Sequence, residues 1–155
     1  MKNSNPSPIG RLLVNNSRLQ ASRMDQLMDR IGLFRGQAIL LVLLSEGDGL
    51  THSEISRSLQ ISPAAATKVI KRLEELQFLQ RRSDPSDERI SRVFLLDEGR
   101  AVLSHIHSAF RKINQAILDG FSLEEEQALR GFLLRIHSNL QEVPLDGFDS
   151  PGLHT

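Results

Sequence analysis

Residues 78–96 read FLQRRSDPSDERISRVFLL, two strand-like runs separated by a charged turn sequence. The runs FLQRR and ISRVFLL contain aromatic or β-branched residues, which are enriched in strands. The Asp, Pro and Ser residues of SDPSDE favour a turn. The stretch therefore predicts a β-hairpin with a long tip. Arg89 lies near the junction of the turn and the second run, and Arg92 follows three residues later.

Two helices are predicted directly before this hairpin. Thr51 and Glu54 stand at capping-box spacing, which predicts the start of a short helix. Ser62 followed by Pro63 repeats the start signal, because serine is a good N-cap and proline is tolerated at the first helical position. A tight turn between a short helix and a longer one predicts a helix-turn-helix, and the hairpin makes it winged. The second helix has an apolar stripe of Ala66, Val69, Ile70, Leu73 and Leu76.

The other face of the second helix is small, polar or basic, which suits the major groove of DNA. The groove admits one helix, and small residues at the leading turn let the backbone approach base edges while cations reach phosphates. The hairpin tip would lie beside the adjacent minor groove, where Arg89 has the reach and charge to enter. The candidate DNA-binding residues are Ser62, Ala64, Ala65, Thr67, Lys68, Lys71, Arg72, Arg82, Asp87, Arg89 and Arg92.

The stretch from Leu50 to Gly99 resembles the MarR family of bacterial transcription regulators. The wing pattern of that family, roughly D-P-x-D-x-R followed by V-x-L-T-x-x-G, is matched here by Asp84, Pro85, Asp87, Arg89, Val93, Leu95 and Gly99. The resemblance implies that Arg89 is the wing arginine and that Asp87 is an acidic partner that orients it.

Two departures from the family pattern carry structural expectations. Gln77 stands where the family usually has glycine, so a non-glycine residue must end the helix there, with some strain or with another cap. Leu96 stands where the family often has threonine, which predicts that Asp97 is the N-cap of the following helix. Either departure could tilt the wing.

The whole chain is predicted to be mainly α with a small β-hairpin wing. Residues 9–142 would form a single MarR-like domain, with the winged helix-turn-helix at 34–99 and dimerisation helices at 9–32 and 100–142. Residues 1–8 and 143–155 are predicted to be flexible tails, because both are polar or rich in Pro and Gly.

The first and last helices are more apolar than a lone winged helix needs, which suggests a partner. The resemblance implies that these helices interleave across a two-fold axis. A two-fold dimer predicts a pseudo-palindromic operator with half-sites about 10 bp apart. Packing within one chain is the alternative. The candidate interface residues are Leu12, Leu13, Leu129, Phe132, Leu133, Ile136 and Leu140.

The resemblance also implies a small aromatic or anionic ligand, bound between the dimerisation helices and the DNA-binding lobe. A ligand of this kind would release a repressor from its operator. The alternative is that the apolar members are plain core, since Met and Phe at helical spacing usually are. The candidate ligand residues are Arg18, Met24, Phe34, Arg35, His105 and Phe110.

Composition narrows the remaining function classes. The chain of 155 residues has no cysteine, which excludes disulfides, thiolate metal sites and thiol-oxidation switches. Its net charge of zero argues against a general polyanion binder, but residues 68–92 hold seven Lys or Arg against five acids, whereas residues 119–155 hold two against seven. The longest apolar run, Ala38–Leu44, is too short to cross a bilayer, so a soluble cytoplasmic protein is predicted.

Other chemistries are weaker hypotheses. No Walker, Rossmann, H-E-x-x-H or G-x-S-x-G pattern occurs, so no enzyme activity and no cofactor are predicted. His105 and His107 diverge on a helix, which argues against a shared metal ion, although His52, His137 and the acids at 124–126 could still meet in a zinc sensor. The main rival is a winged-helix scaffold that binds proteins and not DNA.

Overall fold

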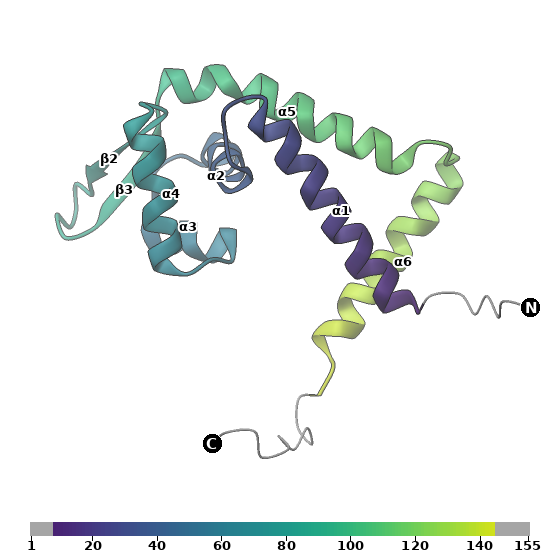
Figure 1. Ribbon diagram of the computed structural model, residues 1–155. Helices are drawn as coiled ribbons and strands as arrows, with labels where there is room; N and C mark the ends of the chain where they lie inside the picture. The colour runs from purple at the N-terminus through teal and green to yellow at the C-terminus, as the bar shows by residue number, and fades with distance from the viewer. Residues whose placement is uncertain (1–7, 145–155) are drawn as a thin grey trace, which may run out of the picture. The chain divides into compact units, whose positions relative to one another are not determined.

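The helices and strands follow one another in the predicted order (Figure 1). The computed structural model describes residues 8–144, so the predicted tails lie almost entirely outside the described residues. The elements are α1 (Ile9–Asp29), α2 (Arg35–Glu46), β1 (Leu50–Thr51), α3 (His52–Leu59), α4 (Pro63–Glu75), β2 (Leu79–Ser83), β3 (Ser91–Leu95), α5 (Asp97–Leu118) and α6 (Leu123–Gln141).

The chain divides into two compact units. The first unit ends at Gln115 and holds the winged helix-turn-helix together with α1, α2 and most of α5. The second unit begins at Ala116 and consists mainly of α6. The single domain expected over 9–142 stays a prediction, whereas the mainly helical winged fold is confirmed.

The wing belongs to a three-stranded antiparallel sheet with the order β1-β3-β2. The predicted hairpin is confirmed, and in it Leu79 pairs with Leu95 and Ser83 pairs with Ser91. Strand β1 was not predicted, because it has only two residues and therefore no alternating pattern. Its Leu50 pairs with Val93, so the loop before α3 is joined to the wing.

Buried apolar side chains from α1, α2, α3, α4, β2, β3 and α5 form one core. Leu40, Ile55, Leu73 and Ile106 are fully buried there. Each comes from a different helix, so the core fixes α3 and α4 relative to the sheet. The exposed face of α4 and the hairpin therefore belong to the same compact unit.

Local capping signals set the starts of α3 and α4. The Thr51 hydroxyl accepts from the Glu54 N–H at 3.3 Å, and the Glu54 carboxylate accepts from the Thr51 N–H at 2.7 Å. The Ser62 hydroxyl accepts from the Ala65 N–H at 3.2 Å. Both predicted helix starts are confirmed, because each depends only on residues three positions apart.

Two glutamines end helices in the left-handed region. Gln77 has φ +58° and Gln60 has φ +53°. After α4, the N–H of Phe78 donates to the Leu73 carbonyl at 3.0 Å. The N–H of Gln77 donates to the Glu74 carbonyl at 3.0 Å, which completes a Schellman motif. The Gln77 side chain also donates to the Glu74 carbonyl, at 3.1 Å. The expectation that a non-glycine residue ends α4 is confirmed, and whether it does so with strain stays a prediction.

The expected N-cap of α5 is wrong by one residue. The helix begins at Asp97, and the Leu96 carbonyl accepts from the Arg100 N–H at 2.9 Å. Leu96 therefore occupies the cap position, and Asp97 lies in the first turn, where its negative charge favours the positive end of the helix dipole. Position 99, in the same turn, requires glycine because a Cβ there would collide with the Phe78 carbonyl.

Helix α6 forms through its own local signals. The Ser122 hydroxyl accepts from the Glu125 N–H at 3.2 Å, and the Glu125 carboxylate accepts from the Ser122 N–H at 2.8 Å. None of the residues in α6 is buried. Within residues 8–144, no helix combines the length and the apolar character that crossing a membrane requires.

Candidate DNA interface

Helix α4 turns one face to the core and the other to solvent. Ala66, Ile70 and Leu73 are buried. Lys68 and Lys71 are exposed, and neither has an acidic partner among the described residues. The positive charge of this face is therefore available to a ligand.

Most of the other cations of this region are already paired with acids. Arg72 contacts Glu75 at 3.2 Å on the same helix. Arg81 contacts Glu74 at 2.6 Å, which ties β2 to the end of α4. That contact raises the pKa of Arg81 and lowers the pKa of Glu74, chiefly through the hydrogen bond between the two side chains. Within residues 68–92, the cations without an acidic partner among the described residues are therefore Lys68, Lys71 and Arg82.

The wing tip presents Arg89 to solvent. Its side chain is 90% exposed, and its Nε and Nη2 donate to the two carboxylate oxygens of Asp87 at 3.0 and 3.1 Å. The Asp87 carboxylate also accepts from the Arg89 backbone N–H at 3.0 Å. The hydrogen bond from the Arg89 side chain is the largest cause that holds the pKa of Asp87 below its usual value. An exposed ion pair adds little stability, so its main consequence here is to orient the guanidinium.

Arg92, near the start of β3, has a different role from Arg89. Arg92 donates to the buried carboxylate of Asp84 and to the Gly49 carbonyl, the latter at 2.9 Å. Asp84 also accepts from the Ser86 N–H at 2.8 Å and from the Ser86 hydroxyl. These bonds, with the Ser86 hydroxyl foremost, lower the pKa of Asp84 far below its usual range.

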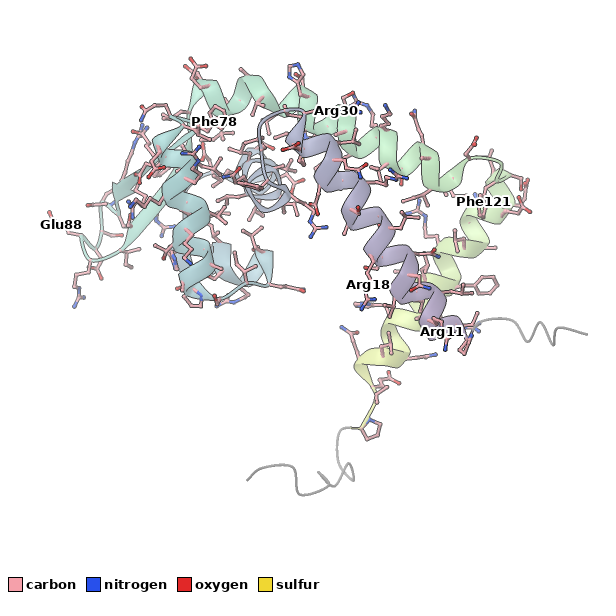
Figure 2. The ribbon with its side chains drawn as sticks, viewed as in Figure 1. Arg11, Arg18, Arg30, Phe78, Glu88 and Phe121 are labelled. Atoms are coloured by element: carbon pink, nitrogen blue, oxygen red, sulfur yellow. The ribbon has the colours of Figure 1, made fainter. Side chains whose placement is uncertain are left out.

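Arg92 was expected to contact DNA, and that expectation stays a prediction. Its guanidinium is half-buried and already holds the hairpin against the loop before α3. A second tie acts at the same place, because Asp48 accepts from the Leu95 N–H at 2.8 Å and from Arg100 at 2.9 Å. Asp48 and Asp84 thus fix the direction in which the wing extends. Figure 2 shows Glu88 at the outer end of the hairpin.

Arg82 lies across the hairpin from Arg92, and these two like charges would repel each other if nothing compensated them. The guanidinium of Arg82 lies 5.1 Å from the centroid of the Phe94 ring, which attracts a cation. Arg82 is exposed and has no acidic partner among residues 8–144, so it remains a candidate for DNA contact.

One contact in this region has no signal in the sequence. The His52 Nε2 lies 2.9 Å from the Thr67 hydroxyl, and the same hydroxyl donates to the Pro63 carbonyl at 3.0 Å. His52 is the first residue of α3, fifteen positions before Thr67. Only the packing of α3 on α4 brings the two side chains together. The remaining predicted residues Ser62 and Ala64 are exposed at the start of α4, and Ala65 is half-buried.

Comparison with known proteins agrees with this geometry. The MarR family pattern matches residues 33–91. The uncharacterised HTH-type transcriptional regulator YdgJ of Bacillus subtilis is 30% identical over 112 residues, which cover 72% of this chain and 68% of YdgJ. This chain belongs to the MarR family.

A relative and a solved structure of lower identity extend the comparison. The HTH-type transcriptional repressor Mb2911 of Mycobacterium bovis is 22% identical over 133 residues, which cover 86% of this chain and 96% of the repressor. The S. aureus MepR–DNA complex has a TM-score of 0.78 at 22% identity, over 86% of this chain and 99% of MepR. That similarity supports the winged-helix fold.

A cleft between the second half of α1 and the start of α2 receives three of the six predicted ligand residues. Arg18, Phe34 and Arg35 line it, and Phe34 is 77% exposed. Arg35 also lies 3.5 Å from Asp25 (Figure 2 labels Arg18 on α1). The other lining residues are Ala21, Ser22, Asp25, Gln26, Asp29, Leu33 and Gly36.

The other three predicted ligand residues do not line this cleft. Met24 is buried in the core, and Phe110 packs half-buried against the core. His105 is exposed on α5. Met24 and Phe110 thus serve packing, which agrees with the alternative that the apolar candidates are plain core. In the described part of the chain, no three His, Asp or Glu side chains are grouped so that they could hold a metal ion.

The predicted interface residues of this MarR-family chain are apolar and largely uncovered. Phe132 is 55% exposed, Leu133 is 45% exposed and Leu140 is 65% exposed. Leu12 of α1 is also exposed. The remaining members, Leu13, Leu129 and Ile136, are half-buried.

Proposed function

We propose that this chain is a homodimeric regulator that binds a pseudo-palindromic DNA operator, with α4 in the major groove and the wing in the adjacent minor groove. The exposed, pre-oriented guanidinium of Arg89 carries the proposal most directly. Arginine inserted into a narrow minor groove gains from the strong negative potential there. The MepR–DNA complex, which has the same fold, adds support.

The free cations of α4 support the same assignment. Lys68 and Lys71 are exposed on the helix that would enter the groove, and their charges are not neutralised by acids in residues 8–144. Each phosphate contact releases condensed counterions, so binding would weaken steeply with salt. A winged-helix protein scaffold would need no such dependence.

Dimerisation is supported by the uncovered apolar residues of α1 and α6. Removing exposed apolar side chains such as Phe132 and Leu133 from water is favourable, and a second copy of the chain would cover them. A two-fold dimer would present two copies of α4, so the operator half-sites would lie about 10 bp apart. The two half-sites would then be related by the same two-fold axis as the two copies of the chain.

Repression and release by a ligand complete the proposal. A relative from Mycobacterium bovis is named a repressor, which favours repression over activation. The cleft with Arg18, Phe34 and Arg35 offers two cations and an exposed aromatic ring, which suit a small aromatic anion. Such a ligand releases DNA only if it prefers the conformer in which the two copies of α4 are mis-spaced.

The test is operator binding by two matched variants. Duplexes are first selected from fragmented genomic DNA, and affinity for the recovered site is then measured by fluorescence anisotropy. Arg89→Ala is expected to weaken binding roughly tenfold to a hundredfold. Arg81→Ala removes the same charge from an arginine already held by Glu74, and it should change binding by less than about threefold.

The salt dependence separates the roles further. Lys71→Ala should weaken binding to all sequences alike and lower the slope of log affinity against log salt by about one. Equal losses for Arg89→Ala and Arg81→Ala would contradict the wing assignment. Selection that enriches no sequence, from protein shown to be a folded dimer, would favour the scaffold function.

A further inference from the structure

The imidazole of His52 on α3 contacts the hydroxyl of Thr67 on α4. The Thr67 hydroxyl makes two contacts within the protein, to the Pro63 carbonyl at 3.0 Å and to His52 Nε2 at 2.9 Å. A hydroxyl has one proton to donate and two lone pairs that accept. Both contacts must be assigned together, because the same oxygen makes them.

Only one proton arrangement satisfies both contacts. The Pro63 carbonyl cannot donate, so the Thr67 proton must point to it. The contact with His52 then requires His52 to donate its Nε2–H. The Thr67 hydroxyl has therefore spent its proton and one lone pair, and the remaining lone pair makes it an acceptor only.

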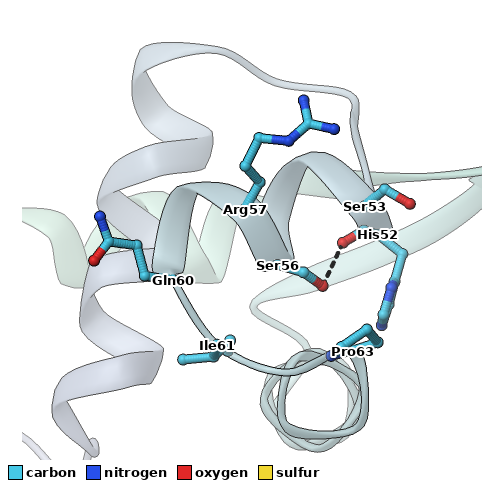
Figure 3. A pocket seen from close by; sticks show the side chains of 7 residues that line it. All are labelled: His52, Ser53, Ser56, Arg57, Gln60, Ile61 and Pro63. Carbon is cyan, nitrogen blue, oxygen red and sulfur yellow. Dashed lines mark hydrogen bonds between the residues drawn. The ribbon is translucent and has the colours of Figure 1, made fainter. Parts of the chain in front are cut away.

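The position of His52 makes this arrangement durable. The capping box of Thr51 and Glu54 holds the backbone directly before it, and the Ser56 hydroxyl donates to the His52 carbonyl at 2.9 Å. Figure 3 shows this bond and the imidazole directed toward Pro63 at the start of α4. The backbone of α3 thus supports the imidazole, and the imidazole in turn holds the Thr67 rotamer.

An acceptor-only hydroxyl distinguishes the base edges of the major groove. Adenine and cytosine present exocyclic amino groups there, whereas guanine and thymine present carbonyl oxygens. The amino groups can donate to Thr67, but the carbonyl oxygens would face another acceptor. Thr67 is exposed on α4, the helix assigned above to the major groove.

We infer that His52 is a positioning residue that makes Thr67 select a base with a major-groove amino group, adenine or cytosine, at one position of each half-site. This inference rests on the proposed DNA-binding function and names one determinant of its specificity. Thr67 contacts the base, and His52 acts through Thr67.

The test compares base preferences of four proteins by selection from randomised duplexes. Thr67→Val removes the hydroxyl and retains the shape, so the base pair at which its preference disappears identifies the Thr67 contact. Wild-type protein should favour adenine or cytosine there by roughly three- to tenfold, as expected for one hydrogen bond. His52→Phe removes the N–H that holds the Thr67 oxygen in place, so the Thr67 side chain can leave the rotamer that donates to the Pro63 carbonyl. The preference should then fall toward equality at that same base pair.

The conservative variant serves as the control. His52→Gln can place its amide N–H near the position of His52 Nε2, so it should restore the adenine or cytosine preference. Circular dichroism and thermal melting establish that each variant is folded. Nitrogen-15 NMR of the wild-type histidines tests the proton arrangement without any substitution, and it should show the neutral His52 protonated at Nε2.

Each outcome separates the two proposals. A wild-type protein that enriches no sequence overturns the DNA-binding function and this inference with it. A recovered operator at which His52→Phe keeps the wild-type preference, or a neutral His52 protonated at Nδ1, overturns the inference alone. Loss of the same preference in Thr67→Val and His52→Phe, with its return in His52→Gln, supports it.

Discussion

Helices α4 and α6 both have apolar residues at helical spacing, but their surroundings differ. In α4, Ala66, Ile70 and Leu73 are buried beneath the helix-turn-helix. In α6, no residue is buried, and large side chains such as Phe132 and Leu133 remain exposed. The same periodicity therefore marks a buried face in one helix and an exposed face in the other. Periodicity alone does not distinguish these cases.

The largest expected effect tests this difference by matched truncations. Leu73→Ala removes a fully buried side chain and should lower the free energy of unfolding by about 2–5 kcal/mol. Leu133→Ala, at 45% exposure, should cost much less when the protein is dilute enough to be monomeric. Urea unfolding at low protein concentration measures both. Equal costs would mean that α6 is packed within its own chain.

A charge in the exposed stripe of α6 should disrupt assembly and leave the fold intact. Leu133→Glu would bury a carboxylate between two copies, so dimer affinity should fall on the order of a hundredfold. Sedimentation equilibrium measures the change, and circular dichroism checks the helix content. Ser138→Glu adds the same charge at an exposed polar position of α6 and should leave assembly nearly unchanged. A dimer that tolerates Leu133→Glu would place the interface elsewhere.

A pH-dependent change in stability should come from the buried carboxylate of Asp84 in the wing. The Ser86 hydroxyl and N–H and the Arg92 guanidinium hold the pKa of Asp84 below its unfolded value of about 3.9. The stability from this carboxylate is therefore present above that value and is lost as pH falls through the folded pKa. Asp84→Asn should lower the melting temperature by about 5 °C at pH 7.

The difference between wild type and Asp84→Asn should then shrink between about pH 5 and pH 2. Thermal melting across this range measures it. A constant difference would show that the carboxylate does not act through its charge. Asp97→Asn, at an exposed acid in the first turn of α5, provides the control for a carboxylate outside this network.

The smallest expected effect concerns the end of α4. Gln77 has φ +58°, a conformation that glycine adopts without steric cost. Gln77→Gly should therefore raise the free energy of unfolding by about 0.5–1 kcal/mol. Gln115→Gly, within α5, should lower it by about 1 kcal/mol because glycine weakens a helix interior. Chemical denaturation distinguishes the two signs, and destabilisation by Gln77→Gly would exclude strain at that position.

The two wing arginines illustrate how far sequence reasoning reaches. Arg89 and its partner Asp87 are two residues apart, so the motif that contains them also predicts their contact. Arg92 depends on Asp84 across the hairpin and on the Gly49 carbonyl, 43 residues away in the chain. The sequence holds no signal for that distant carbonyl, so the structural role of Arg92 could not be predicted from it.

The features that were predictable from the residues alone depend on local interactions. The helix starts at Thr51, Ser62 and Ser122 were predictable because their caps join residues three positions apart. The hairpin and the end of α4 at Gln77 were predictable because they too depend on residues close together in the chain. The family resemblance also rested on a short contiguous pattern around the wing.

Contacts between distant segments have no local pattern that indicates them, and they appear only in the folded chain. Strand β1 became a strand because β3 supplied partners for its backbone groups. Met24 entered the core while Phe34 stayed exposed, although both were candidates for the same ligand site. His52 met Thr67 because the core holds α3 against α4. These outcomes depend on which groups packing brings together, and spacing along the chain does not specify that.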